Sequence, residues 1–393
     1  MSVTSPNRTQ LLIWGGLTAL APLSIDMYLP AFPAIARDYS VSSGQMAYSL
    51  TAYFLGMALG QLLHGPLSDR YGRVRILRFG LLLYLLASLA CAFSPSLGGF
   101  LAARFVQAFG GCAALVIVRA MVRDQCDSTS AAKIFSRLIL IMGLAPMLAP
   151  SLGAVVSAAW GWRSVFIALA IYAAIMLALF QRQFQRDTIG EHPFRLRDSA
   201  NVYVRLLRDQ RLMRYLLCSG FSSAAMFAYI AGSPAVFIEH YGLSATQFAW
   251  VFGINASSFV ICAQLNAWLL RRIPAPRLLH LFQILTVIVA LLLTIVAVLD
   301  GPFYCYWLPI WIYLGCLGLT QPNAVALAMA SQTQHIGSAS ALIGSIQFAL
   351  AMVASDAVGV FQAHDGRPLA LVILTCTMMA LASLLLLKKP LPQ

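Results

Sequence analysis

Residues 65–73 read Gly-Pro-Leu-Ser-Asp-Arg-Tyr-Gly-Arg and lie between two long apolar stretches. The glycines at 65 and 72 suit a tight turn, because glycine permits backbone conformations and close approaches that other residues do not. Asp69 and Arg73 belong to a mixed cluster of charges of the kind found at a membrane surface. By composition alone, the stretch is typical of a basic loop that joins two membrane-spanning helices.

The composition of the whole chain supports this interpretation. Of the 393 residues, 60% are hydrophobic and only 10% are charged, too few to cover the surface of a soluble domain of this size. A helix needs roughly 20 predominantly apolar residues to cross a bilayer. Twelve such stretches occur, approximately at residues 11–34, 45–63, 76–93, 97–122, 134–154, 164–180, 213–237, 248–269, 278–299, 303–330, 337–361 and 369–387. The sequence therefore predicts an all-α membrane protein with twelve transmembrane helices.

Most of the segments between these stretches are short, so neighbouring helices must run antiparallel. The exception is a polar linker that leaves six stretches on either side. We therefore expect an N-terminal six-helix bundle at 1–181, a cytoplasmic linker at 182–212 and a C-terminal six-helix bundle at 213–393. Two pseudo-symmetric bundles of this kind are the organisation of a two-halved transporter.

The formal net charge of +13 is distributed by loop. Basic residues gather at 70–78, at 271–277, in the linker and at 388–389, whereas the opposite loops hold little more than Arg37, Arg163 and Arg367. This positive-inside asymmetry predicts that both termini are cytoplasmic. Because the charge does not form one basic domain, nucleic acid is not an expected partner. The polar first ten residues and the length of the first stretch argue against a cleavable signal.

The sequence offers little for membrane-embedded catalysis, which we weighed as the alternative from another class. It contains no His-Glu-x-x-His, no Gly-x-Gly-Asp with paired intramembrane aspartates and no Walker motif. Residues 337–340 read Gly-Ser-Ala-Ser, but no histidine is placed deep in a stretch to activate a serine. The eight cysteines are scattered singly, without metal-ligand spacing, so neither a metal site nor a disulfide framework is expected.

Residues 65–73 match at every defining position the Gly-x-Leu-x-Asp-Arg-x-Gly-Arg signature of the major facilitator superfamily, which the chain therefore resembles. Arg104-Phe-Val-Gln107 is similar to the family's Arg-x-x-Gln motif, with Ala108 where glycine is usual. Residues 145–154 are similar to its antiporter motif, with alanines in place of two glycines. Residues 23–31, together with Arg123-Asp124, resemble the Bcr/CflA branch of drug:proton antiporters. In the second half, only the basic part of the loop signature remains.

The resemblance implies roles for two sets of residues. The first is a conformational latch on the cytoplasmic face, in which Arg73 pairs with Asp124 and Asp69 faces the start of the eleventh span; this set consists of Asp69, Arg73, Asp124, Gly65 and Gly72. The second is the antiporter motif of the fifth span, carried by Pro146, Pro150 and Gly153.

Two charges lie inside the predicted spans at similar depth, and this argument needs no family. Asp26 is roughly eight residues from the outer end of the first span, and Arg104 roughly seven from that of the fourth. A lone charge in a bilayer costs about 3 kcal/mol on insertion scales, so intramembrane charges face the protein interior and pair. We therefore expect Asp26 and Arg104 to pair with each other.

This pair is either a static structural contact or a proton-coupling site. Burial favours a protonated carboxyl group, whereas a nearby guanidinium favours the carboxylate. A conformational change that separates the two groups would therefore make Asp26 take up a proton, with Arg104 as the fixed positive partner. Asp356, near the outer end of the eleventh span, is a second candidate for proton uptake.

The resemblance also implies a central substrate cavity bordered by particular spans. Aromatic and amide residues on those spans are its candidate lining: Tyr28, Tyr53, Gln107, Phe227, Tyr229, Phe252, Asn255, Asn323, Gln347 and Phe348. The alternative for each is ordinary helix packing or contact with lipid.

Together these patterns predict a proton-coupled multidrug efflux transporter that exports small drug-like molecules by alternating access. The alternatives are a proton-coupled carrier of a specific metabolite and, more remotely, a membrane-embedded enzyme. The expected partners are a hydrophobic or zwitterionic substrate, protons and lipid. We expect no cofactor beyond the proton gradient, a monomer, and a bacterial inner-membrane location.

Overall fold

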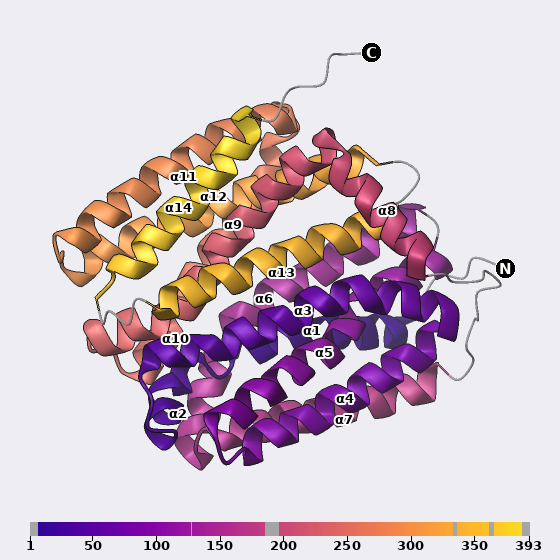
Figure 1. Cartoon of the computed structure of the whole chain (residues 1–393), viewed down its shortest axis with the longest axis horizontal. Coiled ribbons are helices and arrows are strands. Elements are labelled where there is room, and N and C mark those ends of the chain that lie inside the picture. The colour runs from indigo at the N-terminus through magenta and orange to yellow at the C-terminus, as the bar shows by residue number, and fades with distance from the viewer. Residues whose placement is uncertain (1–6, 127, 185–195, 333–335, 361–364, 387–393) are drawn as a thin grey trace. The chain divides into compact units, whose positions relative to one another are not determined.

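The computed structural model describes residues 7–126, 128–184, 196–332, 336–360 and 365–386, and these residues are helical almost throughout (Figure 1). Among them, twelve helices are long and apolar enough to cross a membrane. The predicted all-α fold with twelve spans is therefore confirmed. The chain divides into two compact units, one of residues 1–31 and 52–198 and one of residues 32–51 and 199–393.

The first unit contains the helices α1 (Arg8–Asp26), α4 (Arg73–Phe93), α5 (Leu97–Gln125), α6 (Ser128–Trp160) and α7 (Arg163–Gln183), the 3₁₀ turn η1 (Leu29–Ala31) and most of α3 (Ser43–Tyr71). Helix α4 packs against α5 and α7, and α1 packs against α5, α6 and α7.

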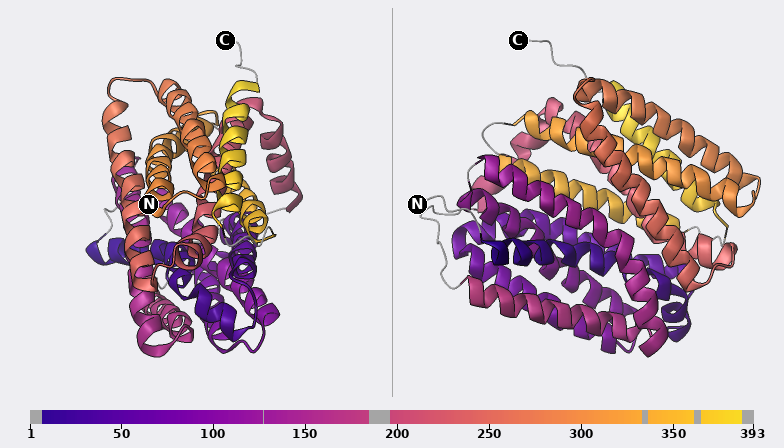
Figure 2. Two further views of the ribbon diagram at one scale, coloured as in Figure 1. Left: turned by 90° about the vertical axis from the view of Figure 1, so that its left-hand side faces the viewer. Right: turned by 180° about the vertical axis from the view of Figure 1, so that it is seen from behind.

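The second unit contains α2 (Phe32–Asp38), α9 (Gln210–Pro234), the π-helical turn η2 (Ala235–His240), α10 (Ala245–Leu269), α11 (Ala275–Val298), α12 (Phe303–Ala330), α13 (Ile336–Val360) and α14 (Arg367–Leu386). Helix α11 packs against α12 and α14, and α9 packs against α12, α13 and α14 (Figures 1 and 2). The pairings of α1, α4, α5, α6 and α7 thus recur as those of α9, α11, α12, α13 and α14, which is the internal repeat expected of a two-halved transporter.

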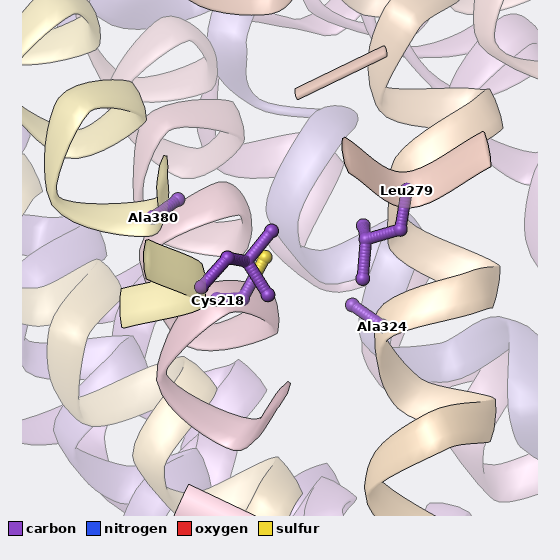
Figure 3. Close-up of a cluster of buried hydrophobic side chains, with 5 residues drawn as sticks. Cys218, Leu279, Ala324 and Ala380 are labelled. Carbon is purple, nitrogen blue, oxygen red and sulfur yellow. The ribbon is translucent and has the colours of Figure 1, made fainter. Parts of the chain in front are cut away.

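Small side chains allow the helices of the second unit to approach closely. One core cluster consists of Cys218, Leu279, Ala324, Ala380 and Leu384, which come from α9, α11, α12 and α14 (Figure 3). Small residues are enriched where membrane helices meet, because lipid supplies no hydrophobic force to drive their association and packing must do so.

Three details of the backbone differ from the sequence-based expectation. The first predicted span is broken: α1 ends at Asp26, and the chain continues through η1 into the short helix α2. Pro30 and Pro33 lie in this region, and proline cannot donate the backbone hydrogen bond that a continuous helix requires.

The segment 65–73 is mostly helix and not an extended loop, because α3 continues to Tyr71 and α4 begins at Arg73. Gly72 alone makes the turn, with a φ of +98°, in the region that favours glycine. A Cβ on Gly65 would meet only Val116, at an ordinary distance of 3.9 Å, so close approach does not explain this glycine.

The linker contains a helix that was not anticipated, α8 (Leu196–Arg208). Its apolar residues Val202 and Leu206 are four residues apart, as are Tyr203 and Leu207 beside them, and Leu206 is buried. That spacing is the signal that identifies α8 in the sequence.

Candidate functional site

The buried arginine of α5 is the centre of the site in the first unit. Arg104 is fully buried, and its Cζ lies 4.3 Å from the ring centroid of Tyr28, 4.4 Å from that of Tyr53 and 5.7 Å from that of Phe166. Aromatic faces attract a cation through the ring quadrupole, by about 2 kcal/mol where the groups are desolvated. Three rings therefore form an aromatic cage around the guanidinium.

Hydrogen bonds fix the guanidinium inside this cage. Nη1 of Arg104 donates to Oε1 of Gln107 at 2.5 Å, and Nη2 donates to the carbonyl oxygen of Ser24 at 3.1 Å. Nε2 of Gln107 in turn donates to Oγ of Ser88 at 2.8 Å. The hydroxyl groups of Ser24 and Tyr84 lie 2.5 Å apart. A polar network across α1, α4 and α5 therefore holds the arginine in place.

Asp26 lies at the last residue of α1 and is 2% exposed. Within the described part of the chain it forms no ion pair with Arg104, and its Oδ1 has no hydrogen-bond partner. The predicted Asp26–Arg104 pair is therefore absent from this structure. The reason is angular: Arg104 contacts the carbonyl of Ser24, and residues two apart on a helix point about 200° apart. The side of α1 that meets Arg104 is therefore not the side that carries Asp26.

Gly153 of the antiporter motif lies directly against the backbone that follows Asp26. A Cβ at position 153 would be 1.7 Å from the carbonyl oxygen of Met27 and 2.6 Å from its carbonyl carbon. Pro150 is buried and Pro146 half-buried, and α6 continues through both prolines. Only glycine allows α6 to approach the break in α1 this closely.

The residues of the predicted latch lie together at the junction of α3, α4 and α5. Arg73 pairs with Asp69 through Nη1 and Oδ1 at 2.5 Å, and with Asp124 through Nε and Oδ2 at 3.1 Å. Nη1 of Arg73 also donates to Oγ of Ser68 at 2.7 Å. The side chains of Asp69 and Asp124 are 60% and 52% exposed, so each pair contributes at most about 1 kcal/mol to stability. Pairs this weak are easily exchanged for others.

The predicted cavity residues divide into separate groups. Tyr28, Tyr53 and Gln107 surround Arg104, as described above. In the second unit, the rings of Tyr229 and Phe252 stack at 5.6 Å, and Asn255 accepts from Nε1 of Trp307 and donates to the Tyr229 hydroxyl, both at 2.9 Å. This group joins α9, α10 and α12.

Asn323 is bonded to Asn266 on α10, its Nδ2 donating to Oδ1 at 2.7 Å, and both side chains are buried. The rings of Phe227 and Phe348 lie 5.4 Å apart, and Gln347 donates to Oγ of Ser219 at 3.4 Å. Sequence reasoning missed Phe166, Ser24, Tyr84 and Ser219 as members of these groups. The spacing of Ser219 and Ser223 by one helical turn was the only available signal for the last of them.

The twelve spans, the repeated helix pairings and a buried charge held by polar and aromatic groups are features of a polytopic membrane transporter. The chain belongs to the Major Facilitator Superfamily, whose family model matches residues 15–355. It is 35% identical over 350 residues to the MFS-type transporter YdgK of Bacillus subtilis, covering 88% of this chain and 87% of that protein. It is 28% identical over 374 residues to the bicyclomycin resistance protein homolog of Haemophilus influenzae, covering 94% of each chain. The multidrug resistance protein MdtL of Escherichia coli is 30% identical over 242 residues, which is 61% of each chain.

Solved structures agree in fold. A D-xylose-proton symporter superposes with a TM-score of 0.74 at 15% identity and covers 98% of each chain. The peptide transporter POT gives a TM-score of 0.76 at 14% identity, covering 98% of this chain and 96% of that one. At these identities the likeness shows the fold alone. The family model and the sequence relatives confirm the predicted family, and the chain is a multi-pass membrane protein.

Proposed function

We propose that this chain is a proton-coupled exporter of small drug-like molecules, working by alternating access in a bacterial inner membrane with both termini in the cytoplasm. The relatives named for bicyclomycin and multidrug resistance support a drug as the cargo. The observation that carries proton coupling is a buried carboxyl group, Asp26, without an ion-pair partner, two residues along α1 from the Ser24 carbonyl that the buried guanidinium of Arg104 contacts.

A buried carboxylate without a partner costs several kcal/mol, and protonation removes most of this cost. The arrangement in this structure is therefore the one that suits a protonated Asp26. Arg104 remains a cation in both states, because its guanidinium does not deprotonate in proteins. Its charge is compensated by the faces of Tyr28 and Tyr53 while Asp26 is neutral.

The break in α1 after Asp26 provides the means of changing this arrangement. Rotation of the end of α1 would turn Asp26 toward the guanidinium, and the ion pair would then favour loss of the proton. The packing of Gly153 against Met27 couples any such rotation to α6. Asp26 is thus the proton carrier and Arg104 its electrostatic partner.

The latch residues act on the cytoplasmic side of the protein. In this proposal, the contacts of Arg73 with Asp69 and Asp124 hold the ends of α3, α4 and α5 together on the cytoplasmic side.

The test is drug-induced proton release from purified protein in detergent. Wild type is expected to release protons when drug is added, and Asp26→Asn is expected to release none. Arg104→Ala is also expected to release few, because without its cation Asp26 retains the proton. Asp356→Asn is the matched control: this acid lies half-buried in α13, and its removal should leave the release intact. Undiminished release from Asp26→Asn would place the coupling group elsewhere, with Asp356 the next residue to examine.

A further inference from the structure

A buried tyrosine of α4 contacts α1 two residues before Asp26. Tyr84 is fully buried, and its hydroxyl oxygen lies 2.5 Å from Oγ of Ser24. Oγ of Ser24 also donates to the carbonyl oxygen of Leu20, at 2.6 Å. A serine hydroxyl has only one proton to donate, so in its contact with Tyr84 it accepts. Tyr84 is therefore the donor of a hydrogen bond that joins α4 to α1.

Ser24 is held by two neighbouring helices at once. Tyr84 on α4 binds its hydroxyl group, and Nη2 of Arg104 on α5 donates to its carbonyl oxygen at 3.1 Å. Residues two apart on a helix point about 200° apart, so the Asp26 side chain lies on another side of α1 while Ser24 faces Tyr84. The two contacts thus fix this end of α1 in the rotation that leaves Asp26 and Arg104 without an ion pair.

An ion pair between Asp26 and Arg104 requires this end of α1 to turn, and the turn carries Ser24 away from Tyr84. The hydrogen bond from Tyr84 therefore belongs to the arrangement that suits a protonated Asp26. A contact that forms in only one of two states shifts the equilibrium between them by its own free energy. Tyr84 can thus influence the protonation of Asp26 through the rotation of α1.

The titratable and charged groups around this end of α1 come from α3, α4, α5 and the turn after α1. They are Tyr28, Tyr53, Tyr84, Cys91 and Arg104. From α6 and α7 the neighbouring residues are Gly153 and Phe166, which do not titrate. Tyrosine and cysteine keep their protons at neutral pH, and arginine keeps its charge. Of the groups described here, Asp26 is therefore the one expected to gain or lose a proton between acid and neutral pH.

We propose that Tyr84 is a positioning residue, which holds the end of α1 in the rotation that turns Asp26 away from Arg104 while the proton is bound. This proposal rests on the proposed proton coupling at Asp26 and deepens it. Loss of the Tyr84 hydroxyl group weakens this arrangement alone, so the ion-paired arrangement, in which Asp26 is charged, forms at lower pH. One hydrogen bond changes such an equilibrium about fivefold, which corresponds to about 0.7 of a pH unit.

A second tyrosine supplies a matched control on the same helix. The hydroxyl group of Tyr172 on α7 donates to the carbonyl oxygen of Gly16 at 2.9 Å. Gly16 precedes Asp26 by about 15 Å along the axis of α1, far from the break in the helix. Tyr172→Phe therefore removes a hydrogen bond from tyrosine to α1, as Tyr84→Phe does, but not at the end that carries Asp26. Both variants keep the aromatic ring and so preserve the packing.

The experiment follows the protonated carboxyl group of Asp26 by infrared difference spectroscopy of the purified full-length protein in detergent, without drug. The carboxyl C=O band that is missing in Asp26→Asn is assigned to Asp26, and its intensity is measured against pH. Tyr84→Phe should lose this band at a pH about 0.7 unit below that of wild type, and Tyr172→Phe at the wild-type pH.

Two further measurements separate positioning from a general loss of stability. Both tyrosine variants should melt slightly below wild type in thermal unfolding, whereas only Tyr84→Phe should shift the band. Ser24→Ala removes the acceptor of the same hydrogen bond and should shift the band in the same direction. Combining Ser24→Ala with Tyr84→Phe should then add little, because the two changes remove one interaction.

The role of Tyr84 would be overturned if Tyr84→Phe lost the band at the wild-type pH, or if Tyr172→Phe shifted it equally. An unmoved band in Ser24→Ala would overturn it as well. Failure of the proposed function gives a different result: wild type would show no Asp26 band at any pH, or Asp26→Asn would still release protons on drug addition. Either of these results would remove this proposal together with the proposed coupling site.

Discussion

Replacement of Gly153 by alanine tests whether the antiporter motif acts through the segment that carries Asp26. The added methyl group would lie 1.7 Å from the carbonyl oxygen of Met27, whereas real Cβ contacts are essentially never shorter than 3.0 Å. The difference, 3.0 minus 1.7, requires α6 and the end of α1 to separate by at least 1.3 Å. Because the obstacle is backbone, no side-chain rotation relieves it.

The energetic cost follows from these distances. Forcing extra volume into a packed core costs about 1–3 kcal/mol, and a clash with backbone belongs at the upper end of that range. Alanine recovers roughly 0.5–1 kcal/mol because it is the better helix former. The net destabilisation is therefore about 2 kcal/mol, which corresponds to a lowering of the melting temperature by about 4–8 °C for a cooperative unit of 150–250 residues.

The assay combines thermal unfolding in detergent with drug-induced proton release, and Gly98→Ala is the control. Gly98 is also helical, but a Cβ there has no atom within 4 Å, so this variant should melt at or slightly above the wild-type temperature. Gly153→Ala should melt lower and release fewer protons, because Asp26 is displaced along with Met27. If Gly153→Ala melted with Gly98→Ala and released protons as wild type does, α6 would not constrain the coupling site.

Three further predictions follow from the contacts. Asp69→Asn removes one of the two carboxylates that pair with Arg73 and should slow transport in vesicles while leaving drug affinity unchanged; transport at the wild-type rate would show that the segment is only a topology signal. Asn266→Leu leaves Asn323 without its side-chain partner and should destabilise the protein by about 1–3 kcal/mol in thermal unfolding, whereas changing both asparagines to leucine should restore most of the loss. Arg104→Lys keeps the charge but loses the planar guanidinium, so drug-induced proton release should fall; wild-type release would show that charge alone suffices.

The spans could be predicted from the sequence because hydropathy depends only on composition over about 20 residues. The depth of Asp26 and Arg104 could be estimated in the same way, from residue counts along each helix. The face of α1 that meets Arg104 could not be predicted, because it depends on how the helix is rotated about its axis. The prolines after Asp26 also interrupt the helical periodicity from which a face is usually inferred. The cage of Tyr28 and Tyr53 was likewise beyond reach, since aromatic residues are common on every face of a membrane helix.

The glycines of the signature illustrate the same limit. Gly65 and Gly72 look alike in the sequence, yet only Gly72 has the positive φ that requires glycine. In the antiporter motif, alanines replace two of the usual glycines. Gly153 is retained, and there the approach to Met27 leaves no room for a side chain. Sequence patterns identify such motifs, but the contact that each glycine permits has to come from the packed structure.

The same type of hydrogen bond, from a side chain to the carbonyl oxygen of a serine on a neighbouring helix, occurs in both units, but with a different donor group in each. In the first, Arg104 on α5 donates to the carbonyl oxygen of Ser24 on α1; in the second, Gln321 on α12 donates to the carbonyl oxygen of Ser219 on α9. Helices α5 and α1 occupy the same places in the internal repeat as α12 and α9, so these are corresponding helix pairs. A guanidinium in this position can respond to the charge of a carboxyl group, whereas an amide can only exchange hydrogen bonds.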